Sequence, residues 1–304
     1  MQEKREANFI GGHWVKSSGE FIHSENPATG EVLWEAASAR GVDVESAVAA
    51  ARDAFTNWRL LSFAEREGYV AKFTDCLKQH QEELATAIHQ ETGKPFWESK
   101  TEIAAMIGKA AISVAAYDAR TGERESNANS IEVRLAHRPI GVFAVLGPYN
   151  FPGHLPNGHI IPALLAGNTV VFKPSELTPK FGELMISCWE QAGLPAGVIN
   201  LIQGARDTCE AVVNAGDING VLYTGSSKTG HAIHKSLAGQ PDKMLALEMG
   251  GNNALILDQV ADIDAAVYTI IQSAFISAGQ RCTCARRLIV VKSVANENLI
   301  KKLI

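Results

Sequence analysis

Short apolar runs alternate with helical patterns through the middle of the chain. Continuous apolar stretches, typical of strands covered on both faces, occur at residues 141–147, 168–173, 197–202, 220–224 and 244–248. Between them, apolar positions recur at helical spacing in residues 154–166, 180–191, 207–215 and 229–237. This alternation predicts an α/β fold, an open Rossmann-like parallel sheet with helices on both faces. Such a sheet binds ligands beyond the carboxyl ends of its strands.

The first third of the chain is predicted to be a helical scaffold that follows two short strand segments. The strand segments are at residues 9–15 and 26–32, and the helices are at 43–54, 65–91 (two helices) and 98–117. Residues 121–129 are polar and predict a loop. The alternation in residues 131–137 predicts a half-exposed strand that protrudes or pairs with another chain.

The pattern after residue 248 is short. It predicts a strand at 253–258, a helix at 261–277 that ends at Gly279, a strand at 288–292 and an amphipathic helix that begins at residue 296. Two strands and about one and a half helices are few for a domain with its own core. We therefore expect a partial domain in a chain truncated at its C-terminus.

Composition narrows the classes of function. The 304 residues are 46% hydrophobic and 20% charged, with a net charge of −5, an ordinary globular balance. There is no basic excess to favour nucleic-acid binding, no apolar run of about 18 residues to span a membrane, and no apolar N-terminal segment like that of a signal peptide. Five scattered cysteines suit a reducing compartment, so we expect a cytoplasmic protein.

One cysteine stands where the last helical pattern turns into a strand. Cys282 follows Gly279 by three residues, at a corner that exposes a thiol to a cleft, and is a candidate nucleophile. It could instead be a small buried hydrophobe, or half of a metal site with Cys284. No second cysteine pair and no nearby histidine accompany it, so no metal is expected. A cysteine–histidine hydrolase would require a histidine that the sequence does not single out.

Polar residues follow the first two of the predicted buried strands. Asn150, between Pro148 and Pro152, places an amide donor on a rigid turn, although asparagine is common in purely structural turns. Lys173 and Glu176 end the next strand. They could hold ribose hydroxyls or could simply be a solvated strand end.

Glycines and a carboxylate follow the last two of these strands. Gly225, Ser226 and Gly230 open a helix, and a helix N-terminus attracts phosphate. Their spacing matches neither the G-x-G-x-x-G fingerprint nor a P-loop, so this signal is weak alone. Glu248, beside Gly250, is a candidate general base in an apolar cleft, or a plain surface residue.

Two stretches are specific in combination. Residues 247–254, which contain Glu248, and residues 275–282, which end at Cys282, resemble the glutamate and cysteine motifs of the NAD(P)-dependent aldehyde dehydrogenase superfamily. The resemblance covers nearly the whole chain. It implies that Cys282 attacks an aldehyde to give a thiohemiacetal and then a thioester. It also implies that Asn150 and the Cys282 N–H stabilise the oxyanion and that Glu248 activates the hydrolytic water.

The same resemblance implies a cofactor site and a division into domains. The carboxylate of Glu176 would accept the ribose 2′-hydroxyl and repel a 2′-phosphate, which favours NAD over NADP. The expected cofactor-binding residues are Lys173, Glu176, Gly225, Ser226, Gly230 and Pro148. The implied division is an NAD-binding domain with its scaffold at 1–120 and 140–248, a protruding oligomerisation segment at 121–139, and an incomplete catalytic domain at 249–304.

Within the family, three stretches resemble the members that oxidise N-succinylglutamate 5-semialdehyde in arginine catabolism: residues 147–159, 248–253 and 279–287. Arg281, next to the nucleophile, is expected to face the substrate channel. An arginine can form a bidentate pair with a carboxylate. We therefore expect Arg281 to bind an anionic, acylated amino-acid aldehyde.

Family members continue beyond residue 304, with the rest of the catalytic domain and a final strand used in assembly. The resemblance therefore implies that this chain alone is impaired or inactive, and that a full-length version is a homo-oligomer. One alternative is a catalytically dead cofactor-binding fragment or pseudoenzyme. Another is a thiol acyltransferase or CoA-type aldehyde dehydrogenase, against which Glu248 argues because activated water favours hydrolysis.

Overall fold

A seven-stranded sheet organises the structure, a computed structural model that describes residues 5–122, 124–128 and 131–304. The strand order is β11-β10-β7-β8-β9-β1-β2. Five of these strands are parallel, namely β7 (Val142–Leu146), β8 (Thr169–Lys173), β9 (Ile199–Leu201), β10 (Gly220–Gly225) and β11 (Met244–Met249). The predicted α/β class with a Rossmann-like sheet is confirmed.

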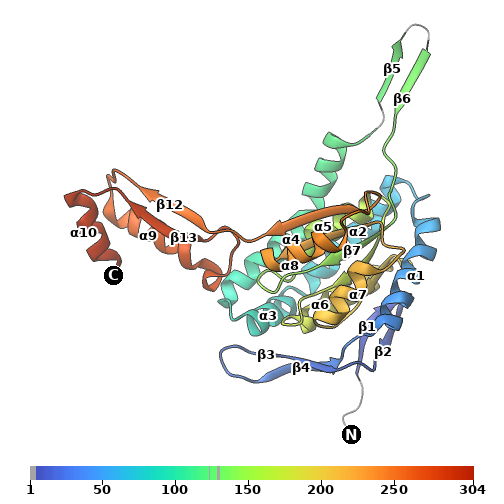
Figure 1. The fold of residues 1–304 in the computed structure, drawn as a ribbon, viewed down its shortest axis with the longest axis horizontal. Coiled ribbons are helices and arrows are strands. Elements are labelled where there is room, and N and C mark those ends of the chain that lie inside the picture. The colour runs from blue at the N-terminus through green and yellow to red at the C-terminus, as the bar shows by residue number, and fades with distance from the viewer. Residues whose placement is uncertain (1–4, 123, 129–130) are drawn as a thin grey trace.

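Helices cover both faces of this sheet (Figure 1). Residues of β7 alternate between two hydrophobic clusters, because successive side chains of a strand point to opposite faces. Phe143 and Val145 pack in the cluster that contains side chains of α2 (Phe63–Gln79), α4 (Phe96–Arg120), α5 (His154–Leu165) and α6 (Pro179–Gln191). Val142 and Ala144 pack in the cluster with α1 (Gly41–Trp58), α7 (Arg206–Asn214) and α8 (Ser227–Ser236).

The N-terminal strands take part in two different sheets. β1 (Glu6–Ile10) and β2 (His13–Lys16) extend the main sheet in antiparallel fashion, with Phe9 opposite Leu201 of β9. β3 (Phe21–Glu25) pairs only with β4 (Val32–Ala37). The sequence predicted short strands here but not that two of them would border the parallel sheet.

Local signals begin and end the scaffold helices, and the helix stop predicted at Gly93 is confirmed. Ser62 caps α2 through a reciprocal pair of hydrogen bonds with Glu65. α3 (Gln81–Thr92) ends at Gly93, whose φ of 70° lies in the left-handed region that glycine adopts without strain. Pro95 then precedes α4, which carries buried acidic residues discussed below.

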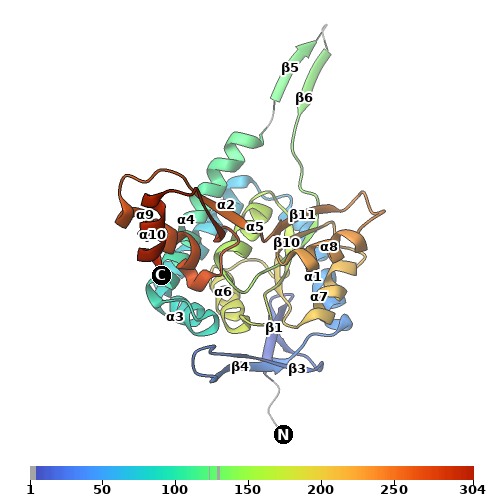
Figure 2. The same cartoon turned by 60° about the vertical axis from the view of Figure 1, so that its left-hand side comes forward.

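A hairpin stands away from the body of the molecule (Figures 1 and 2). It consists of β5 (Arg124–Ala128) and β6 (Ile131–Leu135), paired from Arg124–Leu135 to Ala128–Ile131. The sequence predicted a loop at 121–129, and that prediction was wrong for β5 because its polar residues carry no alternating pattern. Residues 123, 129 and 130 of the predicted protruding segment, and residues 1–4 of the polar N-terminus, lie outside the described residues.

The last 50 residues form a smaller unit to one side of the main sheet (Figure 1). β12 (Asn253–Leu257) pairs in parallel with β13 (Ala285–Val290), and α9 (Ile263–Phe275) and α10 (Val294–Leu303) pack nearby. A short 3₁₀ turn, η1 (Ile276–Gly279), follows α9. The buried cluster of this unit is small, with Leu257, Ile270 and Leu299 at its centre.

Candidate active site

A cleft of about 1120 Å³ opens at the carboxyl ends of the parallel strands. β7 lies between β8 and β10, so the strand order reverses direction beside β7, the position at which open α/β sheets bind ligands. All but one of the residues predicted from the sequence line this cleft. They are Pro148, Asn150, Lys173, Glu176, Gly225, Ser226, Glu248, Arg281 and Cys282.

Cys282 is exposed to the cleft, and Cys284 is buried, as the sequence predicted for each. The corner that carries Cys282 lies between η1 and β13. Asn253, from the neighbouring strand β12, donates through Nδ2 to the carbonyl oxygens of Cys282 at 2.7 Å and Cys284 at 3.3 Å. The backbone at the thiol is therefore tied to the small C-terminal sheet.

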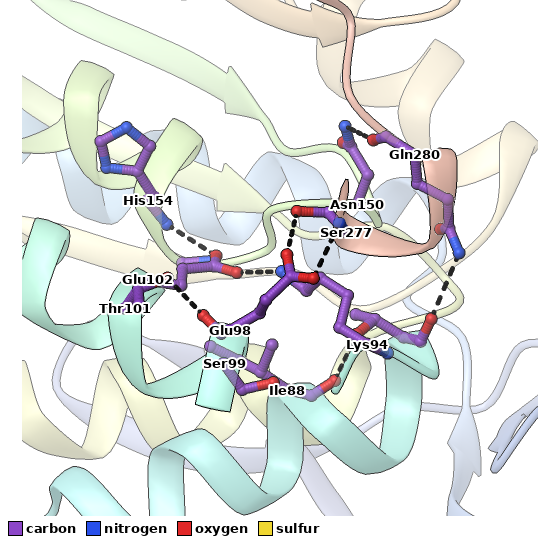
Figure 3. Close-up of polar contacts among 12 residues, drawn as sticks. Ile88, Lys94, Glu98, Ser99, Thr101, Glu102, Asn150, His154, Ser277 and Gln280 are labelled. Carbon is purple, nitrogen blue, oxygen red and sulfur yellow. Dashed lines mark hydrogen bonds and ion pairs between the residues drawn. The ribbon is translucent and has the colours of Figure 1, made fainter. Parts of the chain in front are cut away.

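Asn150 joins the loop after β7 to the cysteine loop. Its Nδ2 donates to the backbone oxygen of Gln280 at 2.6 Å, a contact drawn in Figure 3. A carboxamide has two N–H donors, so the second remains available to a developing oxyanion. Gln280 is held in turn by a 3.4 Å hydrogen bond from its Nε2 to the oxygen of Thr92.

Glu248 lies at the carboxyl end of β11, opposite Thr224 of β10. The Glu248 side chain is exposed at the cleft, not enclosed by apolar groups as the sequence reading supposed. Thr224 Oγ1 is 3.0 Å from Nε2 of His159. Burial lowers the pKa of His159, while the charge of Glu248 acts to raise it. His159 is thus a cleft residue near Glu248 that sequence reasoning missed, because nothing in its helical spacing marks it.

Lys173 and Glu176 lie together at the carboxyl end of β8. Lys173 is 5% exposed, and its Nζ donates to the oxygen of Pro174 at 2.8 Å and is 3.9 Å from the Glu176 carboxylate. Burial lowers the pKa of Lys173, opposed by the charges of Glu176 and Cys209. Burial also raises the pKa of Cys209, which lines the same part of the cleft from α7.

Ser226 is the N-cap of α8, and its Oγ accepts a hydrogen bond from the Thr229 N–H at 3.2 Å. At Gly225, a Cβ would lie 2.3 Å from Oη of Tyr223, so only glycine fits there. Gly230 does not line the cleft. A Cβ on it would lie 2.4 Å from Sδ of Met249, so its small size allows α8 to pack against β11.

Arg281 lines the cleft but also turns toward the protein. Its Nε donates to Ser277 Oγ at 2.9 Å, and its Nη2 is 3.8 Å from the carboxylate of Glu98. The guanidinium carbon lies 5.4 Å from the centre of the Phe151 ring. The side chain is 34% exposed, so part of the guanidinium still faces solvent in the cleft.

Lys109 of α4 is another cation in the cleft, besides Lys173 and Arg281, and sequence reasoning did not single it out. No hydrogen bond or ion pair engages its amine within the described residues. A Cβ at Gly158 would lie 3.7 Å from Lys109 Nζ, so the absent side chain leaves open space beside the amine. His154 is close by. Burial lowers the pKa of its imidazole, and the charges of Lys109 and Lys94 act in the same direction.

The part of the chain that the structure describes has neither a metal-binding cluster nor a helix suited to a membrane. No group of three or more potential metal-binding side chains occurs there. None of its helices is both long and apolar enough to cross a membrane.

Residues 14–304 match the aldehyde dehydrogenase family. The chain is 57% identical over 97% of its length to N-succinylglutamate 5-semialdehyde dehydrogenase from Pseudomonas fluorescens, and it spans 61% of that protein. An aldehyde dehydrogenase from Bacillus cereus matches with a TM-score of 0.92 and 30% identity, over 99% of this chain and 62% of that one. A betaine aldehyde dehydrogenase from Staphylococcus aureus in complex with NAD+ matches with a TM-score of 0.91 and 29% identity, over 99% and 62%.

Proposed function

The chain belongs to the aldehyde dehydrogenase family, and we propose that it oxidises an aldehyde to a carboxylate, with NAD as the hydride acceptor. One observation carries this proposal. The thiol of Cys282, the amide of Asn150 and the carboxylate of Glu248 line a single cleft at the carboxyl ends of a Rossmann-like sheet. These are a nucleophile, an oxyanion donor and a base, the protein groups that covalent aldehyde oxidation needs in addition to a hydride acceptor.

The Cys282 thiol passes its proton to solvent through Glu248 and adds to the aldehyde carbon as a thiolate. A C–S bond forms, the C=O π bond breaks, and its electrons give a thiohemiacetal oxyanion. The Cys282 N–H and the free N–H of Asn150 stabilise that oxyanion. Because Asn150 is already fixed to the Gln280 carbonyl at 2.6 Å, its amide is oriented before the substrate arrives. Preorganised donors of this kind account for a large share of the rate enhancement in acyl chemistry.

The residues at the other end of the cleft fit a dinucleotide. The N-terminus of α8 with Ser226 suits a pyrophosphate, and Gly225 allows the backbone to approach it. Lys173 and Glu176 suit the ribose, and the Glu176 carboxylate favours a 2′-hydroxyl over a 2′-phosphate, hence NAD. A nicotinamide held by these residues would supply the acceptor for the hydride that leaves the thiohemiacetal carbon. The product of that step on the protein is a Cys282 thioester.

Glu248 then removes a proton from the water that hydrolyses the thioester, releasing the carboxylate product and the free thiol. Its exposure at the cleft lets water reach it directly. His159, hydrogen-bonded to Thr224 on the adjacent strand, lies close enough to Glu248 for the carboxylate charge to act on it, while burial lowers the pKa of His159 and favours its neutral form. A base for water at this position favours hydrolysis over transfer of the acyl group to another thiol.

The substrate we favour is N-succinylglutamate 5-semialdehyde, the compound named in the curated relatives. This molecule carries two carboxylates in addition to its aldehyde. Lys109, with open space beside Gly158, and the exposed part of Arg281 supply two cations in the cleft for such an anion. Paired cations would select a dianionic aldehyde over a neutral one.

We assign residues 1–120 and 140–248 to cofactor binding, 249–304 to part of the catalytic domain, and 121–139 to assembly into a homo-oligomer. The hairpin supports the last assignment, because Ile131, Val133 and Leu135 are exposed on one of its strands. All five cysteines are unpaired, which suits a cytoplasmic location.

A second candidate is a cofactor-binding protein without turnover. The observation that favours it is the apolar surface of the C-terminal unit, where Ile256, Tyr268 and Phe275 are 69%, 65% and 67% exposed. We expect turnover by the 304-residue chain to be slow for this reason.

The deciding experiment measures NADH formation with N-succinylglutamate 5-semialdehyde for this chain and for its Cys282→Ala variant. Iodoacetamide labelling of Cys282 is followed in parallel, with and without NAD. Aldehyde-dependent NADH that disappears in Cys282→Ala supports oxidation. Absence of NADH, with labelling that does not respond to NAD, would reject it.

A further inference from the structure

Helix α4 carries two buried glutamates one turn apart. Glu98 is 5% exposed and Glu102 is 2% exposed, and residues four apart share one face of a helix. Both carboxylates point toward the loops that carry the reacting groups, as Figure 3 shows. Neither of them lines the cleft. They are therefore absent from the chemistry described above, although each contacts a catalytic loop.

Glu102 holds the loop that follows Asn150. Its Oε1 accepts hydrogen bonds from the backbone N–H groups of Gly153 at 3.0 Å and His154 at 3.1 Å. Its other oxygen pairs with the ammonium of Lys94, which is 1% exposed and lies 4.2 Å from the centre of the Phe151 ring. The carboxylate thus fixes the backbone three residues after Asn150.

Glu98 holds the turn that precedes Cys282. Its Oε1 accepts the backbone N–H of Ser277 at 2.9 Å, and its Oε2 accepts the hydroxyl of Ser277 at 2.6 Å. Ser277 is fully buried, and its hydroxyl oxygen also accepts from Nε of Arg281. The carboxylate of Glu98 therefore anchors a residue five positions before the thiol.

The turn at Ser277 requires such an anchor. Ser277 and Ala278 have φ angles of 56° and 54°, and Gly279 follows with 69°. L-residues with side chains rarely adopt this left-handed region, and they stay there only where the surroundings force them to. Of these three residues only glycine adopts the conformation without strain. The two hydrogen bonds to Glu98 supply the constraint at Ser277.

We propose that Glu98 is a positioning residue for the nucleophile, and that Glu98 and Glu102 together set the distance between Cys282 and Asn150. Two carboxylates on one face of a single helix accept hydrogen bonds from both loops. The hydrogen bond from Asn150 to the Gln280 carbonyl links the two loops directly to each other. Without Glu98 the turn relaxes toward ordinary φ values, and the thiol moves relative to the oxyanion donor. This role rests on the proposed covalent chemistry of Cys282.

The test measures thiohemiacetal formation directly, so it requires neither turnover nor NAD. Succinic semialdehyde labelled with ¹³C at the aldehyde carbon is titrated against the chain, and the equilibrium constant of the Cys282 adduct is read by NMR. In Glu98→Gln, an NH₂ group replaces one of the two carboxylate oxygens, so Ser277 loses one of its two hydrogen-bond acceptors on Glu98. We expect the constant to fall about tenfold, since small misplacements of reacting groups have effects of this size or larger.

Glu91→Gln is the matched control. Glu91 of α3 is also buried and, like Glu98, accepts hydrogen bonds from the backbone and from a serine hydroxyl. Its donors are the N–H groups of Lys180 and Phe181 and the Ser24 hydroxyl, so it holds α6 and no catalytic loop. Its replacement should shift thermal stability by a similar amount while the adduct constant stays within about twofold of the unaltered chain. An equal loss of adduct in both variants would reduce Glu98 to a general structural role.

A rescue variant completes the design. Ser277→Gly adopts the left-handed conformation without strain, so it should restore part of the adduct constant when added to Glu98→Gln. If Glu98→Gln fails to fold, Ser277→Ala takes its place with a smaller expected loss, because it removes the hydroxyl's bonds to Glu98 and Arg281 but keeps the backbone N–H bond to Glu98. No adduct on the unaltered chain would overturn the proposed function and the role of Glu98 with it. A normal adduct constant in the Glu98 or Ser277 variants would overturn the role of Glu98 alone.

Discussion

The two ends of the cleft are built by different means. The end proposed to bind the cofactor, which carries Lys173 and Glu176, is built on β7 and β8. The residues of both strands are buried throughout between two layers of helices. The nucleophile end rests on a two-stranded sheet with a small core and a largely exposed apolar surface. Packing is enough to place Lys173 at the end of β8. Placing Cys282 requires specific polar ties, from Asn253 and from Glu98 through Ser277.

Where a core is small, the position of a loop depends on individual hydrogen bonds more than on packing. Buried apolar contacts hold a strand in place collectively, so no single residue decides its position. A corner outside such a core depends on a few directional bonds, and each one matters individually. Changes at either end of the cleft should therefore have unequal effects.

Loss of the thiol should have the largest effect, and only at the nucleophile end. Cys282→Ala removes the atom that bonds to the aldehyde, so adduct formation and NADH production should fall below detection. NAD affinity, measured by tryptophan fluorescence, should stay within about threefold because the cofactor end is placed by the packed sheet. A collapse of NAD binding in this variant would show that the two ends are not independent.

Core truncations should destabilise the two regions unequally. Phe172→Ala in β8, at a fully buried position, should lower the free energy of unfolding by about 3–5 kcal/mol and weaken NAD binding as well. Leu257→Ala in the small C-terminal cluster, where the side chain is 7% exposed, should cost about 2 kcal/mol. Chemical denaturation followed by circular dichroism measures both, and equal losses would contradict the comparison.

Glu91 should give the packed region a distinctive dependence on pH. Burial raises the pKa of its carboxyl to about 7, against 4.5 in the unfolded chain, although hydrogen bonds from Ser24 and the α6 backbone act to lower it. The folded state therefore holds a proton that the unfolded state releases. Binding of this proton contributes about 3 kcal/mol to the free energy of unfolding. That contribution is fully present below pH 4.5 and is lost as pH rises through about 7.

Thermal melts of the unaltered chain and of Glu91→Gln between pH 4.5 and 8 check this prediction. Glutamine stays neutral, so the variant should lack this part of the fall in stability. Parallel melting curves for the two proteins would contradict it.

The smallest expected effect concerns substrate charge. Lys109→Met should weaken adduct formation with succinic semialdehyde about tenfold, because a cation next to open space is removed. Butanal, of equal length but neutral, should form its adduct as before. Equal losses with both aldehydes would mean that Lys109 supports the cleft without recognising the anion.

Much of the site could be predicted because its residues follow strands. Asn150 follows β7, and Lys173, Gly225 and Glu248 stand at the ends of β8, β10 and β11. The carboxyl ends of parallel strands meet at one edge of a sheet. Gly230 shows the limit of that reasoning. It lies in the same glycine-containing segment, yet its role in the structure is to admit Met249 beside α8.

What the amino-acid pattern determined alone was the α/β class, the alternation of elements and the strand-end residues. Each of these rests on a local period or on a local neighbour of a buried strand. Three features depended on the tertiary structure. β1 and β2 border the main sheet, β5 pairs with β6, and Glu98 accepts hydrogen bonds from Ser277, 179 residues away. Such contacts depend on how distant segments pack in space, and a buried carboxylate that holds a distant turn has no periodic signature in the chain.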